Sequence, residues 1–586
     1  MRTIANFVSG LLLSALFLLP VSVCAAELQP FFTLKVSGVN TLISVAEKIS
    51  TMAGVADDPS FREIIKTAKD SKGFDHNGII GIAAAVNENG SICPIILLPV
   101  TDLWKVEIAG YPDIFDSIRP FLEKKGADRT NINTPVGQTF VALQKQGYLV
   151  ITSEDAVDQL PADPKKLFAD LEKYTLGVKF DLEKVEFETL EVNLFAPLIF
   201  MAMMQNPDAG EQIENAIEIY RELFKEFATD YYGVTFDPQT ANLELAYTIG
   251  PRKGSDMAKQ FAGYKEQPTI FKGFRGVPGN TVFSFGASAT YGKVNFKDNF
   301  KDNPLMAASM KQWEAFAEGL LEQVTSEDES GELTEFVNKL MGSFQKIIEI
   351  ENGRGASDSA LSFDTEGTLL AAFTVGSLAE IQEFVSLLVD FGGEKIGPFA
   401  EMLEIDFKTL VKQNYATIEG FKVSSFAVPM DKAAPFLSGP TEGLKDLSPG
   451  FFWAVKDASG KQAIALAVGV DFAKTEQAFK SALEQTKTPA PVQKPLGVVS
   501  VQGLGKFLQQ KVYPMVEKAK GPDPAAQKGL AMLASAGNEA TATMDVDCAS
   551  DKMEASFRIS GKAIETIVSF VKFVIESDRT RPAQNF

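Results

Sequence analysis

A recurring order of strand, tight turn, strand and helix constrains this chain more than any motif in it. Apolar runs of strand length, separated by turn residues, predict this order five times. The paired strands are expected at residues 79–86 and 92–100, 232–236 and 242–249, 360–363 and 368–375, 451–455 and 462–470, and 541–546 and 553–559. The helices that follow are expected near 113–124, from 255, and at 378–391, 473–485 and 562–575. Each copy predicts an antiparallel hairpin packed against a helix.

Turn and cap residues support this prediction. Asn89 and Gly90 suit a type I′ turn, in which both central residues need a positive φ. Gly367 and Gly460 stand where a left-handed residue would close a longer loop. Ser377 precedes an apolar helical pattern and is expected to cap that helix.

A further strand precedes several of the hairpins and leads into a helix. These strands are expected at 31–36, 177–182, 281–287 and 497–501, and extra hairpins at 138–152 and 413–428. The fuller unit is β-α, a helical insert of variable length, then β-β-α, and four such units fit the chain. The predicted fold is α+β, with duplicated units and mainly antiparallel sheets covered by helices.

The first 26 residues predict a secretory signal peptide. Arg2 gives a positive start, residues 8–19 form a short apolar run, and Cys24, Ala25 and Ala26 are small. We therefore expect an exported protein, periplasmic or extracellular. An alternative is lipidation of Cys24, which would tether the chain to a membrane surface.

The chain of 586 residues is too long for one hydrophobic core. A stretch rich in glycine and proline, residues 263–279, suggests a boundary. We expect one α+β lobe at 27–275 with two repeat units, and another at 276–586 with two repeat units and an extra hairpin. No apolar run after the leader has the length of a transmembrane helix.

The net charge of −20 argues against two classes of partner. Nucleic acids and anionic lipid head groups both reward basic patches. An apolar ligand or another protein of the cell envelope remains as the expected partner.

Histidine is almost absent, since His76 is the only one in the chain. A histidine-rich metal centre cannot form, and a serine or cysteine triad would have to use His76, which stands in a polar loop, or replace histidine altogether. We expect no catalytic residue, no metal and no cofactor. A pair of carboxylates, as in glycosidases, stays open as an alternative because the chain has 76 acidic residues.

One segment is apolar on all sides and too short to span a bilayer. It contains Leu194, Phe195, Leu198, Phe200, Met201, Met203 and Met204. Such a helix is normally buried. The alternative is a lid or an apolar contact with a ligand, since methionine adapts to varied partners. An amphipathic helix expected at 212–227 could pack on it.

Two cysteines remain after the leader, Cys93 and Cys548. Two buried thiols are one interpretation. Export would also permit a disulfide between them.

The leader, the repeated hairpin-helix units and stretches such as 451–470 resemble uncharacterised exported bacterial α+β proteins. This resemblance implies export and brings no catalytic residue. We predict an exported, non-enzymatic binding or structural protein of the cell envelope. The alternatives are a carrier of a lipid or other apolar ligand, and a carboxylate-based hydrolase.

Overall fold

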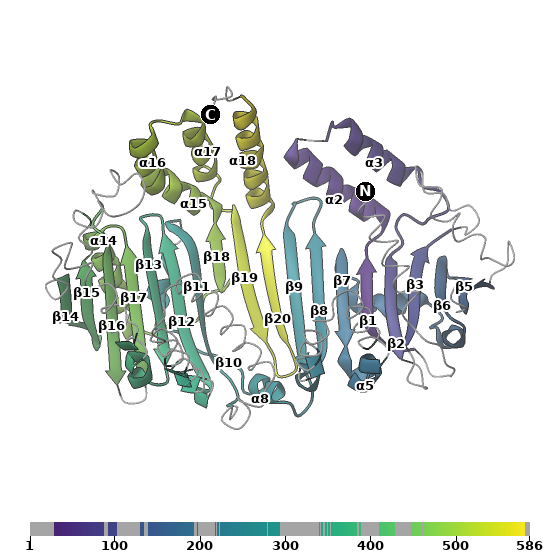
Figure 1. Cartoon of the computed structure of the whole chain (residues 1–586), viewed down its shortest axis with the longest axis horizontal. Coiled ribbons are helices and arrows are strands. Elements are labelled where there is room, and N and C mark those ends of the chain that lie inside the picture. The colour runs from purple at the N-terminus through teal and green to yellow at the C-terminus, as the bar shows by residue number, and fades with distance from the viewer. Residues whose placement is uncertain are drawn as a thin grey trace, which may run out of the picture. The chain divides into compact units, whose positions relative to one another are not determined.

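The computed structural model describes residues 28–54, 56–86, 92–101, 129–133, 139–192, 223–277, 279–293, 353–383, 410–427, 447–458 and 461–580, with isolated residues between them. The fold is mixed α+β, and the strands of the described residues pair antiparallel (Figure 1). The α+β class and the antiparallel pairing expected from the sequence are thus confirmed.

The chain divides into two compact units. Unit 1 comprises the chain up to Ala258 together with Asp551–Arg558, and unit 2 comprises Lys259–Ser550 and the chain from Ile559 onward. The last strand of the chain, β20, therefore belongs almost entirely to unit 1, although it follows most of unit 2 in sequence.

The strands of unit 1 lie in the order β4-β5-β6-β3-β2-β1-β7-β8-β9-β20. Their bounds are β1 Pro30–Val36, β2 Ile80–Val86, β3 Ile92–Pro99, β4 Arg129–Asn133, β5 Thr139–Lys145, β6 Tyr148–Ser153, β7 Leu176–Asp181, β8 Phe227–Phe236, β9 Leu243–Pro251 and β20 Met553–Ile559. Within this order β1 pairs with β7, and these are the first strands of two expected repeat units.

The strands of unit 2 lie in the order β14-β15-β16-β17-β13-β12-β11-β18-β19, and β10 pairs with the end of β11. Their bounds are β10 Lys265–Glu266, β11 Thr281–Thr290, β12 Ala356–Asp364, β13 Thr368–Val375, β14 Val411–Ile418, β15 Phe421–Ala427, β16 Gly450–Ala458, β17 Lys461–Gly469, β18 Gly497–Ser500 and β19 Thr541–Cys548. Here β11 and β18 form the pair that corresponds to β1 and β7.

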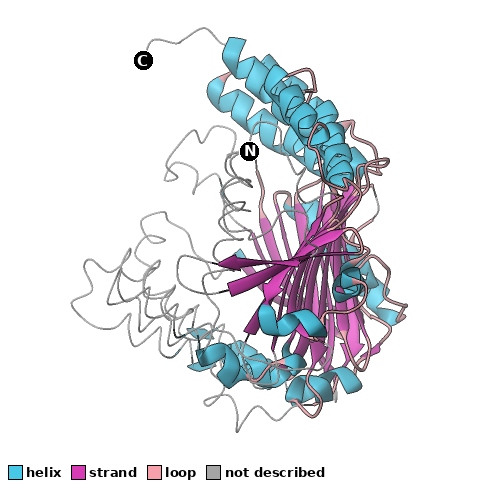
Figure 2. Ribbon diagram, turned by 90° about the vertical axis from the view of Figure 1, so that its right-hand side faces the viewer, coloured by secondary structure: helices cyan, strands magenta, loops and turns pink. Residues whose placement is uncertain are grey.

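Helices flank these strands (Figure 2). The α-helices are α2 Val39–Ala53, α3 Pro59–Lys69, α5 Phe187–Leu190, α8 Asp256–Ala262, α14 Phe472–Glu484, α15 Val501–Phe507, α16 Tyr513–Lys520, α17 Pro524–Ala534 and α18 Gly561–Thr580. Shorter helical turns are η3 Glu154–Gln159, η4 Pro164–Leu171, η5 Leu182–Lys184, η7 Lys272–Arg275, η9 Gln485–Lys487 and η10 Leu508–Val512.

Local chemistry explains several of these boundaries. The Asp471 carboxylate accepts a hydrogen bond from the Lys474 amide at 3.0 Å and caps α14. The predicted cap is confirmed, since the Glu380 amide donates to Ser377 Oγ at 3.4 Å. Gly367 has a φ of 83°, as its predicted place in the turn requires. Asn89, Gly90 and Gly460 lie outside the described residues.

The expected paired strands are present, with one marked difference. The first strand of the second hairpin begins at Phe227 and not at residue 232. The helix expected at 212–227 therefore ends before Phe227, the first residue of β8. The helix expected near 113–124 lies outside the described residues, as does the end of the helix expected at 378–391.

Glycines on adjacent strands of unit 1 lie directly beneath aromatic side chains. Lys35 stands opposite Gly81 on one neighbouring strand and Gly177 on the other, and Gly177 stands opposite Gly233. A Cβ atom at Gly81 would lie 2.4 Å from the Phe168 ring, and one at Gly233 would lie 2.1 Å from the Tyr174 ring. These rings therefore rest directly on the backbone of the strands, and a larger side chain would push them off. We call this side of the strands the covered face of unit 1.

In unit 2 a row of alanines takes the place of the glycines. Ala360, Ala372, Ala465 and Ala454 stand opposite one another across four adjacent strands and are at most 4% exposed. Packed with them in one core are Phe271, Phe274, Phe452, Phe479, Ala482 and Leu483, all buried. The Gly- and Pro-rich stretch 263–279 thus contributes two fully buried phenylalanines to this core. This side of the strands is the covered face of unit 2.

In each unit a buried cation holds a neighbouring loop of the chain in place. Lys35 is 3% exposed, and its Nζ donates to Ser37 Oγ and to the carbonyl oxygens of Glu172 and Tyr174. Arg275 is 8% exposed and donates to the carbonyl oxygens of Gln493, Pro495 and Leu496 at 2.5, 2.8 and 3.1 Å. Burial lowers the pKa of both groups, and Glu172 and Asp545 respectively oppose that effect. Each cation thereby holds the segment that enters β7 or β18.

We expect the substitution Leu483→Ala to lower the free energy of unfolding by about 2–5 kcal/mol, because it opens a cavity in the core of unit 2. Leu483 is fully buried. The matched control is Leu504→Ala, which lies in the same unit on α15 and is 39% exposed, so that a loss of about 1 kcal/mol is expected. Urea denaturation followed by tryptophan fluorescence gives both values. Equal losses would contradict the assignment of Leu483 to the core.

Candidate functional site

The side of unit 1 opposite the covered face is apolar yet half-exposed. Cross-strand register places Val36 opposite Ile80 and Leu176, and Leu176 opposite Val234, which in turn faces Leu245. Leu176 is 41% exposed and Leu245 is 42% exposed. We call this set the apolar face of unit 1. Its members are Leu34, Val36, Ile80, Ile82, Leu176, Val178, Val234 and Leu245.

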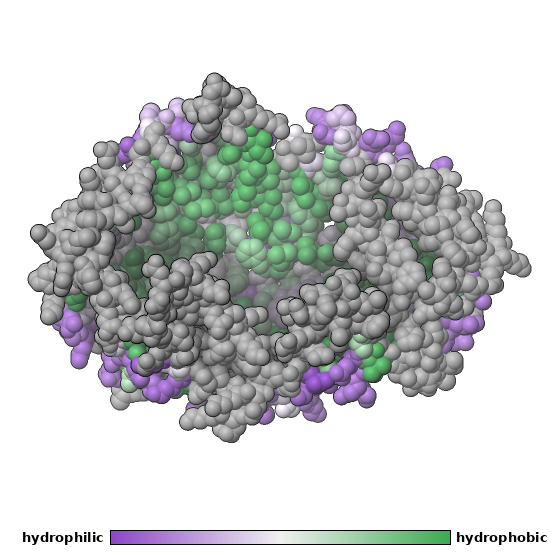
Figure 3. Space-filling view, viewed as in Figure 1, coloured by the Kyte–Doolittle hydropathy of each residue, from purple (hydrophilic) through white to green (hydrophobic). Residues whose placement is uncertain are grey.

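Unit 2 has an equivalent surface. Phe283 stands opposite Phe363 and Val499, while Leu369 stands opposite Val468. Val468 is 43% exposed and Val499 is 42% exposed. We call the set Phe283, Phe363, Leu369, Phe451, Val468 and Val499 the apolar face of unit 2. Hydrophobic residues gather on the visible side of the strands, with hydrophilic residues at the margins (Figure 3).

This patterning departs from the usual antiparallel sheet. A sheet with one solvated side normally alternates apolar residues with polar ones. Along β1 the half-buried positions include Phe32, Leu34 and Val36, while the covered face carries Phe31, Thr33 and Lys35. The half-exposed side is thus the more apolar of the two, which is the composition of a contact surface.

A polar cluster interrupts the apolar face of unit 1. Asp230 and Tyr232 occupy the same side of β8, and Tyr247 stands opposite Tyr232 on β9. Their two rings are 5.0 Å apart between centroids. We call Asp230, Tyr232 and Tyr247 the Asp230 cluster.

The charged form of the Asp230 carboxylate is disfavoured by its surroundings. Burial raises the pKa of Asp230 above its ordinary value, and hydrogen bonds from the hydroxyls of Tyr232 and Tyr247 oppose that rise. Burial and the Asp230 charge also raise the pKa of both tyrosines, so both remain protonated donors at neutral pH. The Asp230 Oδ1 atom is shielded from solvent and has no hydrogen-bond partner among the described residues.

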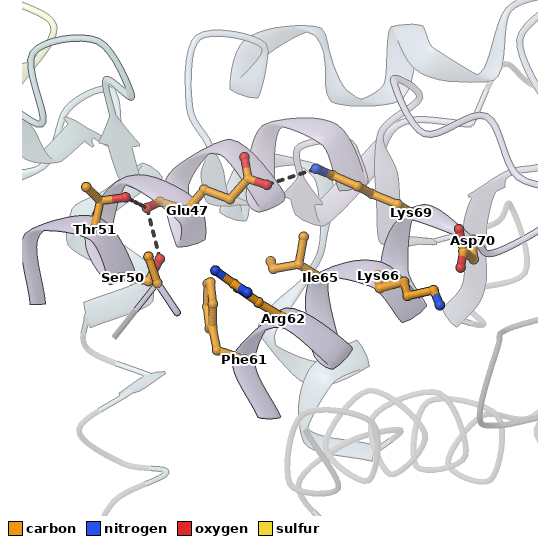
Figure 4. Close-up of a pocket in the computed structure, with 10 residues that line it drawn as sticks. Glu47, Ser50, Thr51, Phe61, Arg62, Ile65, Lys66, Lys69 and Asp70 are labelled. Atoms are coloured by element: carbon orange, nitrogen blue, oxygen red, sulfur yellow. Dashed lines mark hydrogen bonds and ion pairs between the residues drawn. The ribbon is translucent and has the colours of Figure 1, made fainter. Parts of the chain in front are cut away.

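A groove of about 570 Å³ lies between α2 and α3 (Figure 4). Phe61 and Ile65 contribute apolar atoms to it, and three of its charged groups are paired. Lys69 Nζ lies 2.8 Å from Glu47 Oε1, with both side chains about half exposed, and Arg62 pairs with Asp57. Exposed pairs of this kind contribute little energy and impose little selectivity. The groove is therefore a weaker candidate than the apolar faces.

The segment singled out by the sequence lies outside the described residues. Its members are Leu194, Phe195, Leu198, Phe200, Met201, Met203 and Met204. His76 is half-buried in its loop, where its Nε2 atom lies 2.9 Å from the Ser71 carbonyl oxygen. Cys93 is a buried thiol on β3 of unit 1, and Cys548 is a half-buried thiol on β19 of unit 2.

The described part of the chain offers no group of three or more metal-ligating side chains. Within the same residues, no helix combines the length and apolar character needed to cross a bilayer.

Comparisons with protein-family models, with curated proteins and with solved structures give no match. The class that the chain itself defines is a mixed α+β protein with antiparallel sheets, each unit carrying one covered and one half-exposed apolar face.

The raised pKa of Asp230 predicts a pH-dependent effect of Asp230→Asn. The pKa of Asp230 is higher in the folded protein than the value of 3.8 for the unfolded chain. The folded protein therefore loses stability as the pH rises from 3.8 through the pKa of the folded state. The asparagine variant should therefore match the parent protein at about pH 3 and be the more stable of the two at about pH 7.

Urea midpoints at both pH values measure this difference. The control is Glu244→Gln on β9, whose exposed carboxylate pairs with Arg558 at 3.2 Å and should give no gain at neutral pH. A parent protein as stable as the Asp230 variant at both pH values would refute the prediction.

Proposed function

We propose that this is an exported, non-enzymatic binding protein of the cell envelope that carries a lipid or other elongated apolar ligand against its half-exposed apolar faces. The observation that carries this proposal is the half exposure of large aliphatic side chains at cross-strand neighbours, as for Leu176 and Leu245. The signal peptide predicted at residues 1–26 supports export.

The energetics favour an apolar occupant. Exposed apolar surface is stabilised by contact at roughly 25 cal/mol per Å². Contiguous exposed apolar patches are typical of binding surfaces. The net charge of −20 disfavours an anionic membrane surface as the occupant.

We also propose that the fold arose by duplication of a β-α-β-β-α unit. The element order supports four copies, which begin at β1, β7, β11 and β18. The first strands pair antiparallel in twos, β1 with β7 and β11 with β18. The sequence Leu-Gly-Val stands at the start of the second member of each pair, at residues 176–178 in β7 and at 496–498, where Leu496 directly precedes β18.

The proposal predicts that apolar ligand binding is lost when charge enters the apolar face. In the double variant Leu176→Glu with Leu245→Glu, two carboxylates face any bound chain, and affinity for an apolar fluorescent probe should fall at least about tenfold. The control is Val277→Glu, because Val277 is 66% exposed and lies outside both apolar faces. Probe titration, with circular dichroism to confirm folding, measures the effect.

Native mass spectrometry of the purified protein adds an independent measurement. A co-purified apolar molecule that is lost from the double variant would support the proposal. A parent protein that carries no ligand and takes up no apolar probe would overturn it.

A further inference from the structure

The Asp230 cluster is surrounded by aromatic and aliphatic side chains on the exposed side of β7, β8 and β9. Phe180 stands directly opposite Asp230, and Ile249 stands opposite it on the other side. The Phe180 ring lies 5.2 Å from the ring of Phe32 on β1. Tyr232 is 47% exposed and gives the cluster its solvent-exposed edge, while Asp230 Oδ1 is shielded from solvent.

Among the residues that the structure describes, no cation acts on the Asp230 carboxylate. Among the described residues, the groups that act on Asp230 are the two tyrosine hydroxyls, and neither is positively charged. Carboxylates of unit 1 elsewhere do have such partners, for example Asp170, whose Oδ2 lies 2.6 Å from Lys179 Nζ. A half-buried carboxylate without a cation is costly unless a bound group compensates it.

The geometry around the carboxylate suits a positive group. The Oδ1 atom has no protein partner among the described residues and can accept a hydrogen bond; because it is shielded from solvent, an ammonium group reaches it by displacing a neighbouring side chain such as that of Tyr232. The rings of Tyr232 and Tyr247 lie beside it, and aromatic faces attract ammonium groups by about 0.5–2 kcal/mol. Leu176, Leu245 and their neighbours on the same face extend away from the cluster and can hold an alkyl chain.

We propose that the Asp230 cluster binds the ammonium head group of a cationic amphiphile whose chain lies along the apolar face of unit 1. This inference rests on the proposed function and names the ligand class. An anionic head group would meet the Asp230 carboxylate. An alcohol could donate a hydrogen bond to Oδ1 but would leave the negative charge uncompensated.

The test compares three ligands with the same chain and different head groups. Decylammonium, decanol and decanoate are titrated into the purified mature protein by calorimetry, below micelle formation and at about 0.15 M salt. We expect decylammonium to bind at least about tenfold tighter than decanol, and decanoate to bind most weakly.

Two variants separate the cluster from the general negative charge of the chain. Asp230→Asn keeps the shape of the side chain and should lose the preference for decylammonium. Glu244→Gln removes the same charge on β9 but on the covered side of the strands, and should keep that preference. Tyr232→Leu removes one ring and should weaken decylammonium binding about fivefold while leaving decanol binding nearly unchanged.

The outcomes distinguish the two proposals. Equal binding of decylammonium and decanol, or an unchanged preference in Asp230→Asn, would overturn the ammonium site and leave the apolar carrier standing. Absence of binding by all three ligands would count against both. A preference lost equally in Asp230→Asn and Glu244→Gln would show attraction to net charge and would also overturn the site.

Discussion

Direct contact between aromatic rings and strand backbone determines how each unit is built. In unit 1 the rings of Phe168 and Tyr174 occupy the space that side chains at Gly81 and Gly233 would fill. In unit 2 a row of alanines packs in one core with Phe271, Phe274 and Phe479. Because this side is closed by short helical turns and α14, the chain completes its core there. The opposite side can then hold apolar residues at half exposure without loss of the fold.

In each unit, the two sides of the strands therefore have different roles. The covered faces supply stability through their buried hydrophobic cores. The Asp230 cluster lies on the other side and lowers stability at neutral pH, since burial disfavours its charged form. Residues held at a cost to folding are typical of functional sites. A ligand that supplies positive charge would recover that energy on binding, so the cost is connected to the proposed role.

The hairpins were predictable from sequence because turn residues such as Asp364 and Gly367 act locally. The Asp364 carboxylate accepts hydrogen bonds from the amides of Glu366 and Thr368, at 2.9 and 2.8 Å. The Asp230 cluster was not predictable, because it depends on the register of β7, β8 and β9. Sequence reasoning also began that strand at residue 232, which left Asp230 out of it. The glycine row was missed because glycine in a strand usually indicates a bulge, whereas here it admits an aromatic ring.

The position of β20 in unit 1 has a consequence for biogenesis. The strand β20 pairs with β9, although nearly three hundred residues of unit 2 separate the two strands in the chain. During synthesis or export from the N-terminus, β9 must present an unpaired edge until the end of the chain emerges. Unpaired edges recruit other strands and promote aggregation. The first unit to be made is thus among the last to be completed, so a chain truncated before residue 551 leaves its N-terminal half unfinished.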